Sequence, residues 1–373
     1  MVHSSAGPVR ANRFIGRPRL LALAVAAALP LTGIADEARL PRIDVIGEGE
    51  HEVAKQPGSV GIVSQEDLEL QQPRSTEEAL RSIPGVVIKP EEETAIVANI
   101  GMRGLSAGDY KSLILEDGVP VAPGLFVGNG RYYNPRIQRM EGIEVLKGAA
   151  SLRYGPNTIG GVINYQTKQP DDGLSVAARA GSFGYREAVV EAGGSTPSGE
   201  GSAGLVFTKA RSDGFQHKGF EMHDLMLKGG MALGDNQWVG IKFGHYENDA
   251  NISYRGLFLD DFRAEATYNP APDDWFLTGR KSLDLNHEWD INANMRLNTV
   301  LYWSEMFRDY WRFNVDAGAS AAAGRWVYAD TLRGNNRAFD RVGIDSRLHV
   351  RHDAFGIQNE AEIGIRMDEE SDL

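Results

Sequence analysis

Two short patterns in the sequence could carry catalytic chemistry, and each lacks a part that its reaction needs. Residues 104–108 match the G-x-S-x-G spacing of a serine nucleophile, but residues 110–115 predict a strand where that motif needs a helix. His51-Glu52 begins like a zinc-protease motif whose second histidine is missing. The other histidines are scattered along the chain, so the sequence predicts no catalytic residue, no resident metal site and no enzyme.

Arginine stands beside aromatic residues at three places, and this combination suits the binding of an anionic, planar chelate. A guanidinium group donates charge-assisted hydrogen bonds to carboxylates and stacks on flat π-systems. The predicted ligand-binding residues are Arg131, Tyr132, Tyr133, Tyr254, Arg255, Trp311 and Arg312. The alternative is that these aromatics lie at a membrane interface or pack within ordinary loops.

The N-terminus has the three parts of a secretory signal peptide. Arginines are concentrated before residue 20, an apolar run covers residues 20–31, and small residues follow at 33–35. That run is shorter than the ~20 residues that a membrane-spanning helix needs. We therefore predict a signal peptide over residues 1–35. No later run is long enough to span, so residence in a membrane would require a closed barrel.

Composition excludes several classes of protein. The formal charge of −12 argues against a nucleic-acid partner, which would need a basic face. The absence of cysteine excludes disulfides and thiolate metal sites. The 43 glycines and the 9% of aromatic residues are typical of many short strands and turns.

Residues 51–170 predict a small α/β domain, preceded by a polar, flexible segment over residues 36–50. The segment from Ser75 to Glu78 has the spacing of a capping box, and the helix that it opens ends at Pro84-Gly85. Several short apolar runs follow as strand candidates, and Asp117-Gly118 predicts a turn between two of them.

Residues 171–373 predict long strands in which apolar and polar residues alternate. We expect about nine strands, over residues 174–181, 185–193, 203–213, 222–233, 237–248, 280–289, 293–306, 346–352 and 357–369. A soluble sandwich with one solvent face is the main alternative. Two features favour a transmembrane barrel: strands of ~10 residues, and tight turns that alternate with long connections at 249–279 and 307–345.

Four strings in this order resemble the plug domain of TonB-dependent outer-membrane receptors. They are Ile83-Pro-Gly-Val86, Gly101-Met-Arg-Gly-Leu105, Leu115-Glu-Asp-Gly-Val-Pro-Val121 and the glycine-rich residues 143–168. Residues 153–164 are most similar to the ferric-citrate and ferric-siderophore type. The resemblance implies an α/β plug inside an all-β barrel, in the outer membrane of a Gram-negative bacterium.

The resemblance also implies a function, partners and roles for residues. The function is energy-coupled import of a ferric siderophore, with ferric citrate as one candidate; iron is then cargo, and no cofactor is expected. The partners are TonB with its inner-membrane energising complex and outer-membrane lipid, around a monomer. The TonB box corresponds to Ile43, Asp44, Val45 and Ile46, which would pair with TonB as an added strand. Arg103 and Arg153 would face glutamates on the barrel wall, or else pair locally within the plug.

The chain is short for such a receptor. A plugged barrel has 22 strands, which need ~220 residues before any loop, and residues 171–373 supply fewer. We therefore expect the N-terminal part of a receptor, which as written would not insert stably, because unpaired strand edges are costly in lipid. Two other functions stay open: import of another scarce nutrient, such as cobalamin, a metal chelate or a carbohydrate, and a non-transporting binding module.

Overall fold

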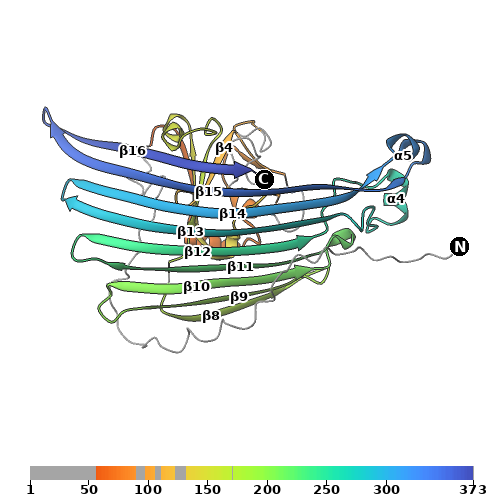
Figure 1. The fold of residues 1–373 in the computed structure, drawn as a ribbon, viewed down its shortest axis with the longest axis horizontal. Helices are drawn as coiled ribbons and strands as arrows, with labels where there is room; N and C mark the ends of the chain where they lie inside the picture. Colours follow the sequence, from red (N-terminus) through yellow and green to blue (C-terminus); the bar gives the residue numbers. More distant parts are fainter. Residues whose placement is uncertain (1–55, 90–96, 106–110, 122–131, 170, 373) are drawn as a thin grey trace.

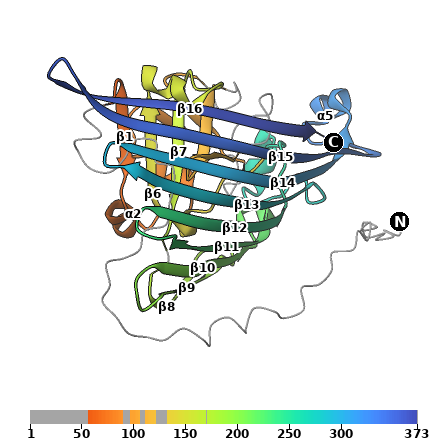
Figure 2. The same ribbon diagram turned by 60° about the vertical axis from the view of Figure 1, so that its left-hand side comes forward.

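The computed structural model describes residues 56–89, 97–105, 111–121, 132–169 and 171–372. The predicted signal peptide and the segment Ile43, Asp44, Val45 and Ile46 lie outside these residues, as does Arg131. The described chain forms an α/β domain, called the plug below, and a large antiparallel sheet. The sheet is curved, and the plug packs against one of its faces (Figures 1 and 2).

The plug is built around a five-stranded mixed sheet with the order β1-β6-β7-β4-β5, in which β4 and β7 are parallel. Strands β2 and β3 form a separate pair. In chain order its elements are β1 (Ser59–Val63), α2 (Gln65–Gln71), α3 (Thr76–Leu80), β2 (Val86–Ile88), β3 (Ile100–Met102), β4 (Ser112–Glu116), β5 (Val119–Pro120), η2 (Ile137–Arg139), β6 (Met140–Lys147), η3 (Ala149–Tyr154) and β7 (Gly161–Thr167).

A serine caps the N-terminus of each α-helix described in the plug, but only one of the two caps is a complete capping box. At α2 the Ser64 hydroxyl accepts from the Asp67 N–H, and the Asp67 carboxylate accepts from the Ser64 N–H. At α3 the Ser75 hydroxyl caps as predicted, but the carboxylate of Glu78 accepts from the N–H of Arg74. The capping box predicted at Ser75 is therefore half formed, because the Glu78 carboxylate accepts from the N–H of Arg74 and not from that of Ser75.

The large sheet contains nine antiparallel strands in sequence order, and this confirms the predicted number of strands. They are β8 (Gly173–Ala180), β9 (Arg186–Ser195), β10 (Gly201–Ser212), β11 (Phe220–Ala232), β12 (Gln237–Ala250), β13 (Trp275–Asn292), β14 (Met295–Val315), β15 (Tyr328–Ala354) and β16 (Ile357–Asp372). Within the described residues the sheet is open, with β8 and β16 at its edges.

Short and long connections separate to opposite ends of the sheet. Residues 233–236, 293–294 and 355–356 turn tightly at one end, while the long connections with α4 (Leu259–Ala264) and α5 (Ala317–Ala323) lie at the other (Figure 1). The predicted long connection over residues 307–345 was wrong in extent. There β14 and β15 continue as a paired hairpin of 21 and 27 residues, well beyond the ~10 that a bilayer requires.

The two faces of the sheet differ in chemistry. The face toward the plug buries ionised groups such as Asp224 and Lys242, while the outward face exposes apolar side chains such as Leu227, Ile241 and Leu301. This apolar-out, polar-in alternation is that of a transmembrane barrel strand. The main apolar core joins the plug to the sheet, since Ile143 and Tyr133 of the plug cluster with Met222, Tyr246 and Met306. No helix among the described residues is both long and apolar enough to cross a membrane.

Candidate functional site: the plug anchor and the outer arginine cluster

Buried charges hold the plug to the sheet. Arg139 of the plug pairs with Glu116, also of the plug, and its Nη1 lies 3.1 Å from Asp224 Oδ1 on β11. From β12, Lys242 Nζ lies 3.1 Å from Glu116 Oε1, 2.7 Å from Asp117 Oδ2 and 3.0 Å from Asp284 Oδ2 on β13. These six residues, Glu116, Asp117, Arg139, Asp224, Lys242 and Asp284, are called the plug anchor.

The turn between β4 and β5 presents the two plug carboxylates. Asp117 and Gly118 both have positive φ, at 49° and 81°, so the predicted Asp-Gly turn is confirmed. The side chain of Asn164 accepts the N–H of Gly118 at 2.9 Å. Asp117 accepts the N–H of Thr167 at 2.9 Å and its hydroxyl at 2.6 Å. The turn is thereby fixed to β7, and its carboxylates face the sheet.

The charges of the anchor compensate one another. Burial acts to raise the pKa of Glu116, but the positive charges of Arg139 and Lys242 outweigh it and the pKa is lowered. The same balance, with Lys242 and Lys228 as the cations, lowers the pKa of Asp117. Both carboxyls are therefore ionised at neutral pH. Burying ions is costly unless each is paired, so the arrangement depends on every partner being present.

Our sequence analysis did not identify the plug anchor, although a signal was present. Lys242 is a single charge on the polar face of its strand, and Lys228 shares that face of the preceding strand with Asp224. A charge in that position needs a partner in the lumen. The Glu116-Asp117 pair, at a turn of the domain that fills the lumen, was the available partner.

Arg103 and Arg153, which were predicted to face barrel glutamates or to pair within the plug, both contact groups of the plug. Arg103 Nη1 donates to the carbonyl oxygen of Ile159 at 3.3 Å, within the plug. The guanidinium of Arg153 lies 5.0 Å from the centre of the Tyr154 ring. Arg347 of β15 approaches the same ring at 4.8 Å, so Tyr154 links plug and sheet. A pairing of Arg103 or Arg153 with barrel glutamates stays a prediction.

A second arrangement lies toward the end of the sheet that carries the long connections. The hydroxyl of Tyr132, from the plug, accepts from Arg337 Nη1 at 2.6 Å and from Arg308 Nη2 at 3.4 Å. The Arg308 guanidinium lies 4.3 Å from the centre of the Tyr132 ring. Arg308 belongs to β14 and Arg337 to β15. Tyr132, Arg308 and Arg337 are called the outer arginine cluster; the two arginines were not among the predicted site residues.

Tyr132 and Tyr133 point in different directions, although both were predicted to contact ligand. Tyr133 is 1% exposed and packs edge-on against Tyr246, with ring centres 5.3 Å apart. Its hydroxyl accepts from Arg139 Nη2 at 2.6 Å. Tyr133 therefore belongs to the contact between plug and anchor, and only Tyr132 faces the outer arginines.

Trp311 and Arg312 do not act as a pair, because they belong to β14 and successive strand residues face opposite ways. Trp311 stacks on Trp275, with ring centres 6.3 Å apart. Arg312 lies 5.6 Å from the ring centre of Tyr254 and 5.3 Å from that of Tyr310. The prediction that Trp311 and Arg312 lie in a loop is thus wrong, since both belong to β14; their contact with a ligand stays a prediction. Tyr254 and Arg312 are brought together instead.

Arg255 joins the two long outer connections. It pairs with Asp274 at the end of its own connection and donates to the carbonyl of Phe313 on β14. Its guanidinium also lies 5.9 Å from the ring centre of Trp326 and 5.3 Å from that of Tyr328. We call these contacts the Arg255 clamp.

We expect Arg255→Ala to separate the two connections. Asp274, which is almost fully buried, would lose its cation, and buried charges that lose their partner destabilise their surroundings. Limited proteolysis of the folded protein should cleave residues 251–274 of the variant at least about 5-fold faster than those of the parent chain. Arg263→Ala is the control, because Arg263 on α4 is exposed and pairs with the nearby Asp260. Equal cleavage rates in the two variants would contradict the clamp.

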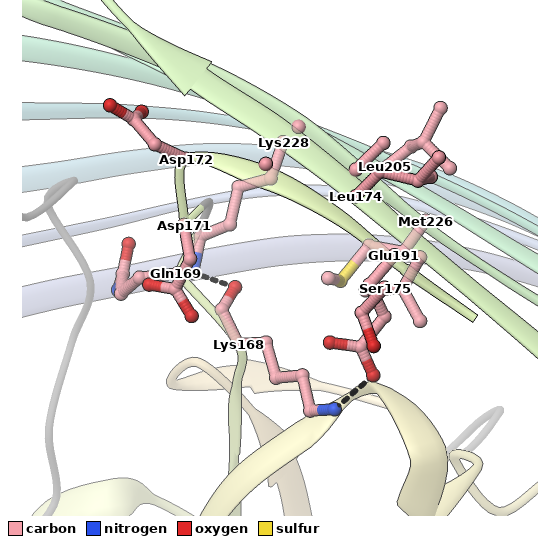
Figure 3. A pocket seen from close by; sticks show the side chains of 14 residues that line it. Lys168, Gln169, Asp171, Asp172, Leu174, Ser175, Glu191, Leu205, Met226 and Lys228 are labelled. Atoms are coloured by element: carbon pink, nitrogen blue, oxygen red, sulfur yellow. Dashed lines mark hydrogen bonds and ion pairs between the residues drawn. The ribbon is translucent and has the colours of Figure 1, made fainter. Parts of the chain in front are cut away.

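A cavity of about 170 Å³ lies where the plug passes into β8 (Figure 3). The side chain of Lys168 points to Glu191 of β9, with which it pairs, and Lys228 Nζ lies 3.0 Å from Thr167 Oγ1. Lys168 is thus paired with Glu191, and Lys228 binds groups at the end of β7. These contacts join the end of the plug to the sheet. The lining of the cavity gives no argument for a ligand.

Comparison with known proteins agrees with this architecture. Residues 52–162 match the family described as TonB-dependent Receptor Plug Domain. The chain is 36% identical over 121 residues to the iron-regulated outer membrane virulence protein of Vibrio cholerae, covering 30% of this chain and 18% of that protein. It is 32% identical over 189 residues to the ferric enterobactin receptor PirA of Pseudomonas aeruginosa, covering 42% and 25%.

Solved structures show the same fold. The unliganded ferric citrate transporter FecA aligns with a TM-score of 0.75 at 22% identity, covering 90% of this chain and 51% of that one. The ferric-catecholate receptor Fiu of E. coli K12 aligns at 0.69 and 19% identity, covering 86% and 50%. The chain thus spans about half the length of these structures and less of the two curated relatives. Residues 52–162 thus match the TonB-dependent receptor plug family, and the chain as a whole has the fold of these solved ferric-chelate transporters and receptors.

Proposed function

We propose that the chain forms the plug and part of the barrel of a receptor that imports an anionic ferric chelate with energy from TonB. The outer arginine cluster carries the proposal. It places two guanidinium groups and a phenol together where plug and sheet meet toward the long connections, and this is the chemistry that binds carboxylate or catecholate oxygens.

The hydrogen-bonding state of Arg308 supports a ligand there. Its Nε is buried and has no hydrogen-bond partner among the described residues. An unsatisfied buried donor costs free energy, so its presence favours a group that arrives from outside. Arg312, Tyr254 and Tyr310 extend the same chemistry along β14 toward the long connections.

The geometry suggests how binding at the outer end would reach the plug anchor. Tyr132 is adjacent in sequence to Tyr133, whose hydroxyl accepts from Arg139. A ligand that moves Tyr132 would therefore act next to Tyr133, which contacts the Arg139 that pairs with Asp224 of the sheet. In this proposal TonB pairs with residues 43–46 and supplies the work, and iron passes through as cargo without serving as a cofactor.

An uptake assay with the complete reading frame tests the proposal. The receptor is expressed in a strain without its own siderophore receptors, and radiolabelled iron is offered as the citrate, a hydroxamate or a catecholate. We expect uptake of at least one chelate and its loss when TonB is deleted. Uptake that does not require TonB, or none with any ferric chelate, would contradict the proposal.

Replacing Arg308 and Arg337 together by alanine should weaken chelate binding at least about 10-fold, because two charge-assisted hydrogen bonds are lost. Arg263→Ala, which changes an exposed outer arginine outside the cluster, is the matched control and should bind normally. Binding to whole cells at 4 °C separates this effect from transport. Unchanged affinity in the double variant would place the ligand elsewhere.

A second candidate is cobalamin, because curated relatives named vitamin B12 transporter BtuB match more of this chain. The one from Photobacterium profundum is 24% identical over 276 residues, 67% of this chain and 44% of that protein. Labelled cyanocobalamin in the same strain distinguishes the two. Uptake of cobalamin together with no uptake of any ferric chelate would favour the second candidate over the first.

A further inference from the structure

We propose that His223, His245 and Glu247 form a binding site for a divalent transition metal of the Zn²⁺ class on the outward face of the sheet. His223 of β11 stands directly opposite Glu247 of β12 in the strand register. His245 precedes Glu247 by two residues on β12 and so projects from the same face. The three side chains therefore converge across one pair of strands.

The distances fit a metal. His223 Nε2 lies 3.6 Å from Glu247 Oε2, and His245 Nε2 lies 3.5 Å from Glu247 Oε1. One atom from each residue can be chosen so that all three lie within 4.8 Å of one another. Tetrahedral zinc with bonds of about 2.0–2.1 Å to nitrogen and oxygen needs ligand atoms about 3.4 Å apart. Small rotations of the side chains therefore bring three ligand atoms to the positions of a tetrahedral zinc site, and a water molecule can be the fourth ligand.

The neighbouring pairs on this face show what an ordinary ion pair looks like there. Lys209 pairs with Glu221 at 2.8 Å, and Lys281 pairs with Glu305 at 3.0 Å, one amine to one carboxylate in each case. In the proposed site two imidazoles meet a single carboxylate. Two neutral nitrogen ligands with one carboxylate are a zinc donor set, as in known His₂Glu sites.

The surroundings permit a hydrated ion. The three side chains are 37%, 27% and 40% exposed, so water and metal can reach them. They lie toward the long connections, whereas the exposed apolar residues Leu227 and Ile241 lie further toward the short turns. Lys281 stands opposite His245 in the register, but its ammonium is held by Glu305. The metal would thus link β11 to β12 outside the apolar band.

Zinc titration of the product of the complete reading frame, purified in detergent, tests the site. We expect one zinc ion to bind through these residues. His223→Gln and His245→Gln should each weaken the affinity for zinc at least 10-fold. His287→Gln is the matched control, because His287 bonds to Gln237 elsewhere on the sheet and belongs to no such group in the described residues. Cobalt in place of zinc should give the visible spectrum of a tetrahedral site only when both histidines are present.

A second measurement needs no variant. Modification of histidines by diethylpyrocarbonate, followed by mass spectrometry, should be slowed by zinc at His223 and His245 and not at His287. Zinc affinity unchanged in both His223→Gln and His245→Gln, or equal protection of all three histidines, would overturn the proposal. Equal binding of Mg²⁺ would also overturn it, because that ion prefers oxygen ligands.

Discussion

Lys242→Met should destabilise the attachment of the plug to the sheet by about 3–5 kcal/mol, the usual cost of leaving buried charges without their partner. The loss is large because one ammonium group serves three carboxylates, those of Glu116, Asp117 and Asp284. Methionine keeps the length and the apolar stem of the side chain, so the change tests the charge and little else.

A single reporter cysteine measures this effect, since the chain has no cysteine of its own. Ala98 is fully buried in the plug, so in an Ala98→Cys background a thiol reagent should react only when the plug opens. Lys281→Met is the control, because its ion pair lies half-exposed on the outward face and should contribute less than about 1 kcal/mol. Equal labelling rates for the two variants would refute the role of Lys242.

The stability deficit of Lys242→Met should depend on pH in one direction. In the parent chain the pKa values of Glu116 and Asp117 lie below their ordinary 4.5 and 3.8, so their stabilising contribution is lost only as the pH falls below that range. Removal of the Lys242 charge shifts this balance toward burial, so both pKa values rise relative to the parent chain. A group with a raised pKa destabilises the fold as the pH rises through it. We therefore expect the deficit of Lys242→Met to be largest at pH 7 and to shrink toward pH 4.

Arg139→Met should have a comparable effect, about 3–5 kcal/mol, through a different partner. Glu116 would keep Lys242, but Asp224 would lose the cation with which it pairs, and its Oδ2 already has no hydrogen-bond partner in the described residues. Most of the stability lost in Arg139→Met should therefore come from the unpaired charge of Asp224. Labelling at Ala98→Cys measures it in the same way.

A double-mutant cycle identifies that partner. Asp224→Asn removes the orphaned charge, so the double variant Arg139→Met/Asp224→Asn should regain most of the stability lost in Arg139→Met. Lys281→Met combined with Asp224→Asn should show no coupling, since Lys281 lies on the other face of the sheet. Additive effects of Arg139→Met and Asp224→Asn would mean that their contact contributes nothing.

The fold could be predicted from local patterns because period-two alternation depends on each strand alone. The strings around residues 143–168 identified the plug, and alternation located all nine strands. The ends of β14 and β15 could not be predicted, because beyond the bilayer neither face must be apolar and the pattern weakens. The error at Trp311 and Arg312 followed directly, since a pair read as loop neighbours lies in a strand.

The candidate sites were harder to predict because they depend on contacts between distant segments. Lys242 reaches Asp117, far away in the sequence, and Tyr132 reaches Arg308 and Arg337. His223 and Glu247 meet only once the register of β11 and β12 is known. Residue type alone favoured arginines beside aromatics, and this located Tyr132, Tyr254 and Arg312 correctly in the outer region while missing the arginines that approach Tyr132.

The Arg255 clamp has an entropic consequence for ligand capture. Its contacts, all within the chain, fix two long connections to each other. Ordering loops and side chains at the moment of binding reduces affinity, at about 0.5–1.5 kcal/mol for each side chain that is immobilised. Here much of that ordering is completed during folding, so in the proposed function a ligand would meet a surface that is already preorganised.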